Sequence, residues 1–324
     1  RSDNSSLIFI NRDPNLLMID HGEKLLNILK DKLGEDQLHR IVIELSANKF
    51  SGETKSLCHL LNYYRTYGIK IAVDHLGRDT QLDSVTALSP NILKVNLDTL
   101  SYKAWDTHKD MVDSLGLLAR KIGAVLLFEG IESVYQLQYA WNNGGRYYQG
   151  FYLAEPRPEF MRRDELKERF KQECHSFIVS EKKTLERKFR KKEALKESIE
   201  EIVQKLKPAS NDIPMLKVLG KNLGQFAFRL YICDEDGFQT SPNIVREEGD
   251  WRAREEYINK NWSWRPYFLK TIIKMRNSQQ GQLSDPYSDI ETGDTIRTFS
   301  IPLNEGEYLF VDISYDYLFE HDIF

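Results

Sequence analysis

The sequence predicts an α/β domain built on parallel strands, followed by a long helix and a smaller α+β domain with an antiparallel sheet. Three observations predict this. Short apolar segments alternate with amphipathic segments through residues 7–153, which is typical of βα units. Residues 159–207 combine dense mixed charge with apolar residues at helical spacing. After residue 208, strand-like segments are separated by Gly and Asp-Gly turns, which favours an antiparallel sheet.

The strands predicted in the first domain are short and almost continuously apolar, as expected for strands buried on both faces. They cover residues 7–10, 41–45, 69–73, 92–95 and 124–128, and a further strand is expected at 147–153. Amphipathic helices are expected between them, at 57–67, 111–122 and 133–142. The alternation implies a parallel sheet with helices outside, either an open doubly wound sheet or a barrel.

The predicted domain boundaries follow the changes in composition. The first domain is expected to cover residues 1–160, ending at Pro156 and Pro158, the connecting helix 161–207, and the second domain 208–324. Apolar residues along the connecting helix form a stripe that could pair with a second copy, so a homodimer is expected. The spacing of this stripe is too irregular for a strict coiled coil.

Composition and charge exclude several classes of partner. The 324 residues are 41% hydrophobic and 29% charged, with a net charge of -4, so there is no overall positive field to bind a nucleic-acid polymer or an anionic membrane. No apolar segment is long enough to span a membrane. Cys58, Cys174 and Cys233 are isolated, without a CxxC pair, which favours the reducing cytoplasm over an oxidising compartment.

A polar residue lies at the end of each predicted strand of the first domain. Because the carboxyl ends of parallel barrel strands meet at one face, these side chains are expected to converge. They are Asn11, Glu44, Asp74, Lys94, Glu129 and Gln149.

The types of these residues indicate a metal site. Three carboxylates and an amide oxygen are hard ligands that suit Mg²⁺ or Mn²⁺ better than zinc or copper. Two such metals would activate a water and stabilise a phosphoryl group during in-line displacement. Lys94 could orient that water or offset charge on the phosphate.

Each residue also has a structural interpretation. Asn11 and Asp74 could be caps or turn formers, and Glu129 before a glycine could shape a loop. Glu44 and Lys94 could be a buried ion pair, and Gln149 could satisfy backbone groups. The agreement of successive strands favours a site over separate coincidences.

Four segments resemble, in order, the DDFG, LKID, AEGVE and QGYYFSKP signatures of EAL domains. They are residues 73–77 (VDHLG), 93–96 (LKVN), 128–132 (FEGIE) and 148–156 (YQGFYLAEP). Asn11 and Glu44 match that family's strand-end Asn and the first Glu of its ExTE motif. The resemblance covers roughly residues 7–160, and the overall arrangement is similar to the YkuI-type members of the family.

The resemblance implies a TIM-like (β/α) barrel that hydrolyses cyclic di-GMP to pGpG on a pair of Mg²⁺ or Mn²⁺ ions. Asn11, Glu44, Asp74 and Glu129 would be metal ligands, with His75 as a further candidate. Lys94 would position the water, and Gln149 would support the site. The resemblance therefore implies that Lys94, Glu129 and Gln149 are the catalytic residues.

Departures from the family pattern bear on activity. The Glu-Ala-Leu segment is expected upstream and is absent, so the barrel is expected to be incomplete at its N-terminus and these 324 residues alone to be inactive. His75 stands at the second Asp of DDFG, and Ala47 at the second Glu of ExTE. These changes keep open a second function, a non-catalytic cyclic di-GMP receptor. A third, hydrolysis of another phosphate ester, rests on fold analogy alone.

The second domain resembles PAS or Cache-like sensor domains over about residues 212–320. The resemblance rests on residues 262–268 (WSWRPYF), 284–287 (SDPY), 292–293 (TG) and 299–303 (FSIPL). Aromatic walls with one arginine suit a small polar ligand in an apolar pocket. The candidate ligand-binding residues are Trp264, Arg265, Tyr267 and Asp285. The alternative is that the aromatic residues are core and Arg265 is a surface ion pair.

Overall fold

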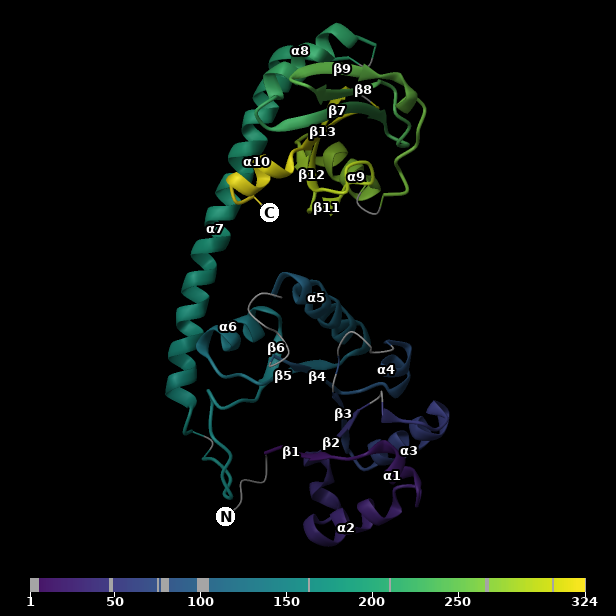
Figure 1. The fold of residues 1–324 in the computed structure, drawn as a ribbon, viewed down its shortest axis with the longest axis vertical. Helices are drawn as coiled ribbons and strands as arrows, with labels where there is room; N and C mark the ends of the chain where they lie inside the picture. The colour runs from purple at the N-terminus through teal and green to yellow at the C-terminus, as the bar shows by residue number, and fades with distance from the viewer. Residues whose placement is uncertain are drawn as a thin grey trace. The chain divides into compact units, whose positions relative to one another are not determined.

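The computed structural model describes residues 6–46, 49–74, 76, 82–97, 105–162, 164–209, 211–265, 268–304 and 306–323 (Figure 1). The chain divides into two compact units, Arg1–Gln172 and Glu173–Phe324. The domain boundaries predicted at residues 160 and 207 differ from this division and remain a prediction.

The first unit contains a six-stranded parallel sheet whose strand order follows the sequence. The strands are β1 (Ile8–Asn11), β2 (Ile41–Ser46), β3 (Lys70–Asp74), β4 (Ile92–Asn96), β5 (Val125–Glu129) and β6 (Gly145–Tyr148). Each strand pairs in parallel with the next, from β1 to β6. Sequential parallel pairing through helical crossovers is the βα pattern that the sequence predicted.

Helices connect these strands and cover the outer face of the sheet. They are α1 (Pro14–Met18), α2 (Glu23–Leu33), the 3-10 helix η1 (Glu35–Arg40), α3 (Thr54–Thr66), α4 (Leu82–Leu88), α5 (Trp105–Ile122) and α6 (Val134–Asn142). Helix α3 packs on β3, α5 on β4 and β5, and α6 on β6. Local sequence sets some helix starts: Asp13 and Ser133 accept hydrogen bonds from the first-turn backbone of α1 and α6.

The inner face of the sheet is curved. Val42, Ala72, Ile92 and Leu127, one from each of four neighbouring strands, form a buried apolar layer there, with Leu7, Phe9, Val125 and Tyr147 packed against it. Strands β1 and β6 are the two edges, yet the rings of Phe9 and Tyr147 approach edge to face with centroids 6.5 Å apart. The sheet therefore curls round its own interior as a TIM-like half-barrel, which confirms the predicted fold class.

The last predicted strand, at 147–153, is wrong in its bounds. Strand β6 begins at Gly145 and ends at Tyr148, and residues 151–153 form a turn. The aromatic and apolar residues at 151–153 imitate a strand in sequence, but the backbone leaves the sheet at Gly150.

The second unit is built on an antiparallel sheet with the order β10-β12-β13-β7-β8-β9, and β11 pairs separately with β12. Its strands are β7 (Ala227–Asp234), β8 (Asn243–Glu247), β9 (Asp250–Arg254), β10 (Gln282–Leu283), β11 (Tyr287–Ser288), β12 (Thr295–Asn304) and β13 (Glu307–Ile313). The helices are α7 (Lys167–Leu206), α8 (Ile213–Leu223), the 3-10 helix η4 (Glu255–Tyr257), α9 (Phe268–Ser278) and α10 (Tyr315–Glu320). The antiparallel sheet predicted for the second domain is confirmed.

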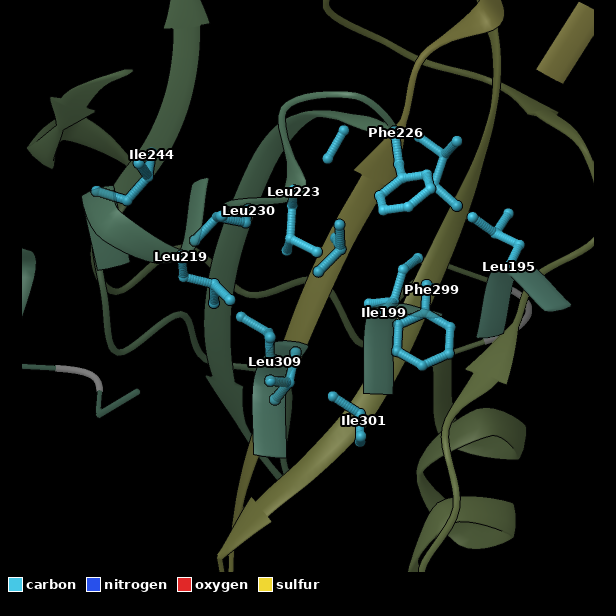
Figure 2. Packing of buried hydrophobic residues seen from close by; sticks show 14 of the residues in the cluster. Leu195, Ile199, Leu219, Leu223, Phe226, Leu230, Ile244, Phe299, Ile301 and Leu309 are labelled. Atoms are coloured by element: carbon cyan, nitrogen blue, oxygen red, sulfur yellow. The ribbon is translucent and has the colours of Figure 1, made fainter. Parts of the chain in front are cut away.

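Alternate residues of the central strands face two separate cores, as the two-residue period of a strand requires. On one face, Leu230, Leu309 and Val311 pack with α7 and α8 through residues such as Ile199 and Leu219 (Figure 2). On the other face, a cluster packs against α9. Its members are Tyr231, Cys233, Phe268, Ile272, Met275, Tyr308 and Phe310. The sheet is thus buried on both faces.

Helix α7 is 40 residues long and begins at Lys167, later than the predicted start of the connecting helix. Its buried residues are Phe177, Leu195, Ile199 and Val203, whereas Leu185 and Phe189 between them are exposed. Among the described helices, this one included, none combines the length and apolar character that crossing a membrane would need.

We predict that Gly150→Ala destabilises the first unit by about 1–3 kcal/mol, the usual cost of forcing an extra group into a packed site. A Cβ at Gly150 would collide with the backbone of Ile131. The Ile131 carbonyl accepts a hydrogen bond from the Tyr152 N–H, and the Ile131 N–H donates to the Gln149 carbonyl. The collision would therefore disturb the hydrogen bonds that hold the segment after β6. Urea denaturation measures the loss.

The matched control is Gly144→Asn. Gly144 has a φ of 79°, and no neighbouring atom lies within 4 Å of the point that a Cβ would occupy. Asparagine tolerates this backbone region. Equal losses for the two variants would contradict the steric explanation at Gly150.

Candidate functional site

The polar residues of the first unit lie one step beyond its apolar inner layer. On every strand, the candidate residue follows an inner-layer residue by two positions, so both side chains point to the same face. The pairs are Phe9 and Asn11, Val42 and Glu44, Ala72 and Asp74, Ile92 and Lys94, Leu127 and Glu129, and Tyr147 and Gln149. The structure therefore brings the predicted side chains to the carboxyl-end rim of the half-barrel, above its apolar interior.

Lys94 is the centre of the group. Its Nζ lies 2.9 Å from Glu129 Oε2, 3.1 Å from Glu44 Oε1 and 3.8 Å from Asp74 Oδ2. The side chains of Lys94, Glu44 and Asp74 are at most 10% exposed, and that of Glu129 is 17% exposed. Four strands thus contribute to one buried ionic cluster, in which Glu129 is the most accessible carboxylate.

Electrostatics in this cluster keep Lys94 protonated. Burial alone would lower the pKa of Lys94, but the hydrogen bond and charge of Glu129, together with Asp74 and Glu44, raise it above 10.5. Three carboxylates against one ammonium leave these four groups with a net charge of about -2. The cluster is suited to attract a further cation.

Asn11 and Gln149 lie at the two edges of the rim and are exposed. Asn11 lines a cavity of about 250 Å³ with Arg12, Asp20 and Lys24. The backbone of Gln149 continues the pairing of β5 with β6, because its N–H donates to the Phe128 carbonyl at 2.8 Å. Its side chain is therefore held at the rim by its backbone.

Two polar residues on the same face were not predicted from the sequence. Ser46 lies two positions after Glu44 and is in register with Asp74, and Asn96 lies two positions after Lys94 and is in register with Glu129. The two-residue period from Glu44 and Lys94 could have identified them. His75 and Ala47 lie outside the described residues.

The donor set fits a hard divalent cation in kind, since it consists of carboxylate and amide oxygens. Across the described parts of the chain, however, no three His, Cys, Asp or Glu residues are grouped so that they could hold a metal ion. In the cluster, the Lys94 ammonium already contacts all three carboxylates.

A second candidate site is a cavity of about 480 Å³ in the second unit. Three of the four residues predicted to bind a ligand there, Trp264, Arg265 and Asp285, line it. The fourth, Tyr267, lies outside the described residues. The other lining residues are Lys270, Pro286, Tyr287, Ser288 and Ile290.

A directed chain of hydrogen bonds runs from this cavity into the sheet. Thr298 Oγ1 donates to Asp312 Oδ1 at 2.6 Å, because an ionised carboxylate can only accept. The Thr298 hydroxyl must then accept from the Tyr287 hydroxyl, also at 2.6 Å. The Tyr287 oxygen in turn accepts from Arg265 Nη1 at 3.3 Å. Every proton in the chain therefore points from the cavity towards Asp312.

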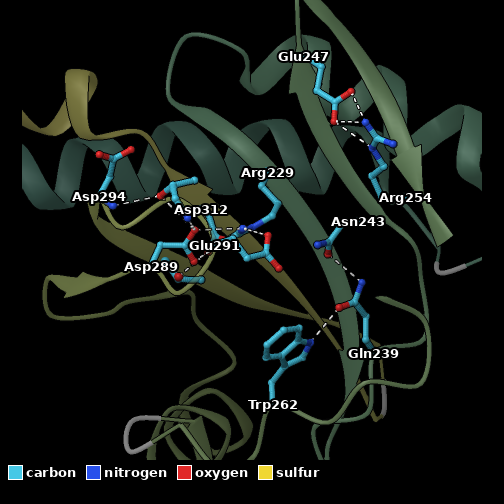
Figure 3. Close-up of polar contacts among 12 residues, drawn as sticks. Arg229, Gln239, Asn243, Glu247, Arg254, Trp262, Asp289, Glu291, Asp294 and Asp312 are labelled. Carbon is cyan, nitrogen blue, oxygen red and sulfur yellow. Dashed lines mark hydrogen bonds and ion pairs between the residues drawn. The ribbon is translucent and has the colours of Figure 1, made fainter. Parts of the chain in front are cut away.

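Arg229 completes this network from the adjacent strand β7. Its guanidinium donates to Asp312 at 2.6 Å, to Asp289 at 2.8 Å and to Glu291 at 2.7 Å (Figure 3). Burial alone would lower the pKa of Arg229, but Asp312 and Asp289 raise it. Burial alone would raise the pKa of Asp289, yet the hydrogen bond from Arg229 lowers it below 3.8. The network joins β7, β13 and the segment before β12 through charged groups.

Comparison with known proteins agrees with these two architectures. A model of the EAL domain matches residues 2–156, and a model described as an EAL-domain associated signalling protein domain matches residues 160–324. The chain belongs to the EAL-domain family, in the group with this associated domain. We refer to Arg1–Gln172 as the EAL unit and to Glu173–Phe324 as the signalling unit.

Two relatives match this chain over very different lengths. The uncharacterized EAL-domain containing protein YkuI of Bacillus subtilis (strain 168) is 47% identical over 326 residues, which cover 99% of this chain and 80% of that protein. The probable cyclic di-GMP phosphodiesterase PdeB of Escherichia coli (strain K12) is 26% identical over 149 residues, covering 44% of this chain and 28% of that protein.

The crystal structure of Bacillus subtilis YkuI superimposes with a TM-score of 0.91, covering 97% of this chain and 80% of that chain at 47% identity. That structure contains its substrate cyclic di-GMP and calcium.

We predict that Lys94→Met destabilises the EAL unit by about 3–5 kcal/mol, because it leaves buried carboxylates without their partner. Since the folded-state pKa of Lys94 lies above 10.5, its contribution is complete below that pH and is lost as the pH rises through the folded value. The difference in unfolding free energy between wild type and variant should therefore shrink at more alkaline pH.

Denaturation of both proteins across a pH series measures this difference. The control is Lys55→Met on the exposed face of α3, which is expected to change stability by less than about 0.5 kcal/mol. A Lys94→Met loss no larger than the control, or one that grows at alkaline pH, would contradict the role given to Lys94.

We predict that Thr298→Val destabilises the signalling unit by about 1–3 kcal/mol, the cost of leaving buried groups without a partner. The change keeps the side-chain shape but removes the hydroxyl between Tyr287 and Asp312. Thermal unfolding compares it with Thr295→Val, at the half-buried start of the same strand. Similar losses of stability in the two variants would argue against a continuous chain of hydrogen bonds from Tyr287 to Asp312.

Proposed function

We propose that the EAL unit binds cyclic di-GMP and that, in a version extended upstream by the Glu-Ala-Leu segment, it hydrolyses one phosphodiester bond to give pGpG, in a slow reaction regulated by the signalling unit. The observation that carries this proposal is the cluster of Glu44, Asp74 and Glu129 around Lys94 at the rim of the half-barrel. The cyclic di-GMP and calcium in the crystal structure of YkuI support it.

The residues proposed to hold Mg²⁺ or Mn²⁺ are Asn11, Glu44, Asp74 and Glu129, with His75 as an additional ligand. When bound, these ions would lower the pKa of a water and stabilise the charge on the phosphoryl group. The net negative charge of the cluster supports cation binding, and carboxylate oxygens suit these metals.

Lys94 is proposed to act as a hydrogen-bond donor. Because its pKa is raised, it remains an ammonium at neutral pH and does not act as a general base. Its protons can orient a water or neutralise charge on a phosphate oxygen. Glu129 is the most solvent-accessible of the three carboxylates and is proposed to lie nearest to an incoming substrate, and Gln149 at the rim would support the site.

Slow turnover is proposed because two residues differ from the family's motifs. Ala47 and His75 stand where the motifs have Glu and Asp, so the site carries fewer carboxylates. Fewer hard ligands weaken the binding of Mg²⁺, for which imidazole is a poor ligand.

The second candidate function is a non-catalytic cyclic di-GMP receptor. One observation favours it: Lys94 contacts all three carboxylates, and within the described residues no metal-binding group of acidic or imidazole side chains is formed. In a receptor, Lys94 would bind a phosphate of the ligand directly.

For the signalling unit we propose a PAS or Cache-like sensor role, with a small ligand in the cavity lined by Trp264, Arg265 and Asp285. The presence of this cavity beside the directed hydrogen-bond chain supports the proposal. We also propose a homodimer, in which the exposed Leu185 and Phe189 of α7 contact a second copy.

Calorimetry with cyclic di-GMP, with and without Mg²⁺ or Mn²⁺, followed by chromatography of the products, tests the function of the EAL unit. In a version extended upstream by the Glu-Ala-Leu segment, we expect binding, and pGpG that accumulates only with metal and is lost in Glu129→Gln. The 324 residues alone are expected to give no pGpG. Glu168→Gln, an exposed residue of α7, is the control and should behave as wild type.

Three outcomes separate the candidates. Metal-dependent pGpG supports the phosphodiesterase, and His75→Asp should then raise its rate, by about tenfold if metal affinity limits turnover. Binding without product in the version extended by the Glu-Ala-Leu segment supports the receptor. If cyclic di-GMP does not bind at all, both candidates are wrong.

A further inference from the structure

The cavity of the signalling unit contains a buried arginine in an aromatic setting. Arg265 is only 7% exposed, and its guanidinium lies 4.5 Å from the ring centre of Trp262 and 5.6 Å from that of Tyr287. Such stacking fixes the plane of a guanidinium at low conformational cost. The arginine is therefore presented to the cavity in a defined orientation.

The hydrogen-bond chain strengthens this orientation. The Tyr287 oxygen accepts from Arg265 Nη1, while the Tyr287 proton is committed to Thr298. Tyr287 thus stabilises the positive charge of Arg265 and cannot at the same time donate to a ligand. The donors that remain at the described cavity lining include the cationic side chains of Arg265 and Lys270.

Among the described residues that line the cavity, the charge is positive overall. Arg265 and Lys270 contribute two cations, and Asp285 contributes one carboxylate, which gives a net charge of about +1. The Asp285 side chain is fully exposed and lies 3.8 Å from Arg297, so its charge is partly offset outside the cavity. This balance favours a ligand with a single negative charge.

The remaining wall is largely apolar. Trp264 and Ile290 are 60% and 67% exposed at the cavity, and Pro286 lies between the polar residues. Exposed large apolar side chains beside a charged pocket favour a ligand that covers them. The volume of about 480 Å³ is within the range of small-molecule sites.

We propose that this cavity binds a small organic carboxylate, with its carboxylate towards Arg265 and Lys270 and its apolar body against Trp264 and Ile290. The planar fork of an arginine matches a carboxylate, and a net charge of about +1 suits a monoanion better than a phosphate dianion. The proposal rests on the sensor role given above to the signalling unit and identifies its ligand class.

The test is calorimetric titration of the complete chain with matched probes. The carboxylates are phenylacetate and hexanoate, the neutral counterparts are phenylacetamide and hexanamide, and inorganic phosphate is the competing anion. We expect at least one carboxylate to bind saturably, with its amide at least about tenfold weaker, equivalent to a loss of about 1.4 kcal/mol.

Two variants locate the binding. Arg265→Lys keeps the charge but loses the fork, and Lys270→Ala removes an exposed side chain that the fold does not need. Both should weaken carboxylate binding several-fold. Lys274→Ala, one turn further along α9 and outside the cavity lining, should not.

The proposal is overturned if no carboxylate binds, if acids and amides bind equally, or if phosphate binds more tightly than every carboxylate. Equal binding of amides at this cavity would leave the sensor role standing but remove the preference for anions. Titration of the same variants with cyclic di-GMP should be unchanged, which separates this result from any failure of the EAL unit.

Discussion

Lys94 holds together the ends of four strands of the EAL unit, because one ammonium contacts the carboxylates of Glu44, Asp74 and Glu129. Carboxylates so little exposed need compensation, and Lys94 provides part of it. The same side chains stand two positions beyond the apolar inner layer, so the pairing that buries the layer also positions the cluster. A shift of one residue in any strand would turn its polar group towards the helices.

Much of the EAL unit could be predicted because its signals are local. Continuous apolar runs predicted the strands, but β1, β3 and β5 begin and end one residue later than predicted, so that they end on Asn11, Asp74 and Glu129. That shift follows from pairing with neighbouring strands, which a single segment does not reveal. The convergence of the polar residues could be inferred from the parallel topology, but the central position of Lys94 could not, since it depends on side-chain reach across three strands.

Other features depend on contacts distant in sequence. The bounds of β6 could not be predicted because the backbone of Ile131 excludes a side chain at Gly150. In the signalling unit, Arg229 and Asp312 are 83 residues apart, and neither belongs to a motif. The aromatic cavity could be predicted, because Trp264 and Arg265 are adjacent in an aromatic-rich segment, residues 262–268. The chain of hydrogen bonds from this cavity to Asp312 could not be predicted, because it depends on the pairing of β12 with β13.

Helix α7 has a consequence for how this protein can be divided. Leu195, Ile199 and Val203 belong to the same buried cluster as the sheet of the signalling unit. A shortened protein that began after residue 207 would expose that cluster to water and should aggregate or remain unfolded. Any attempt to produce the signalling unit alone should therefore retain the C-terminal half of the helix, which is part of its core.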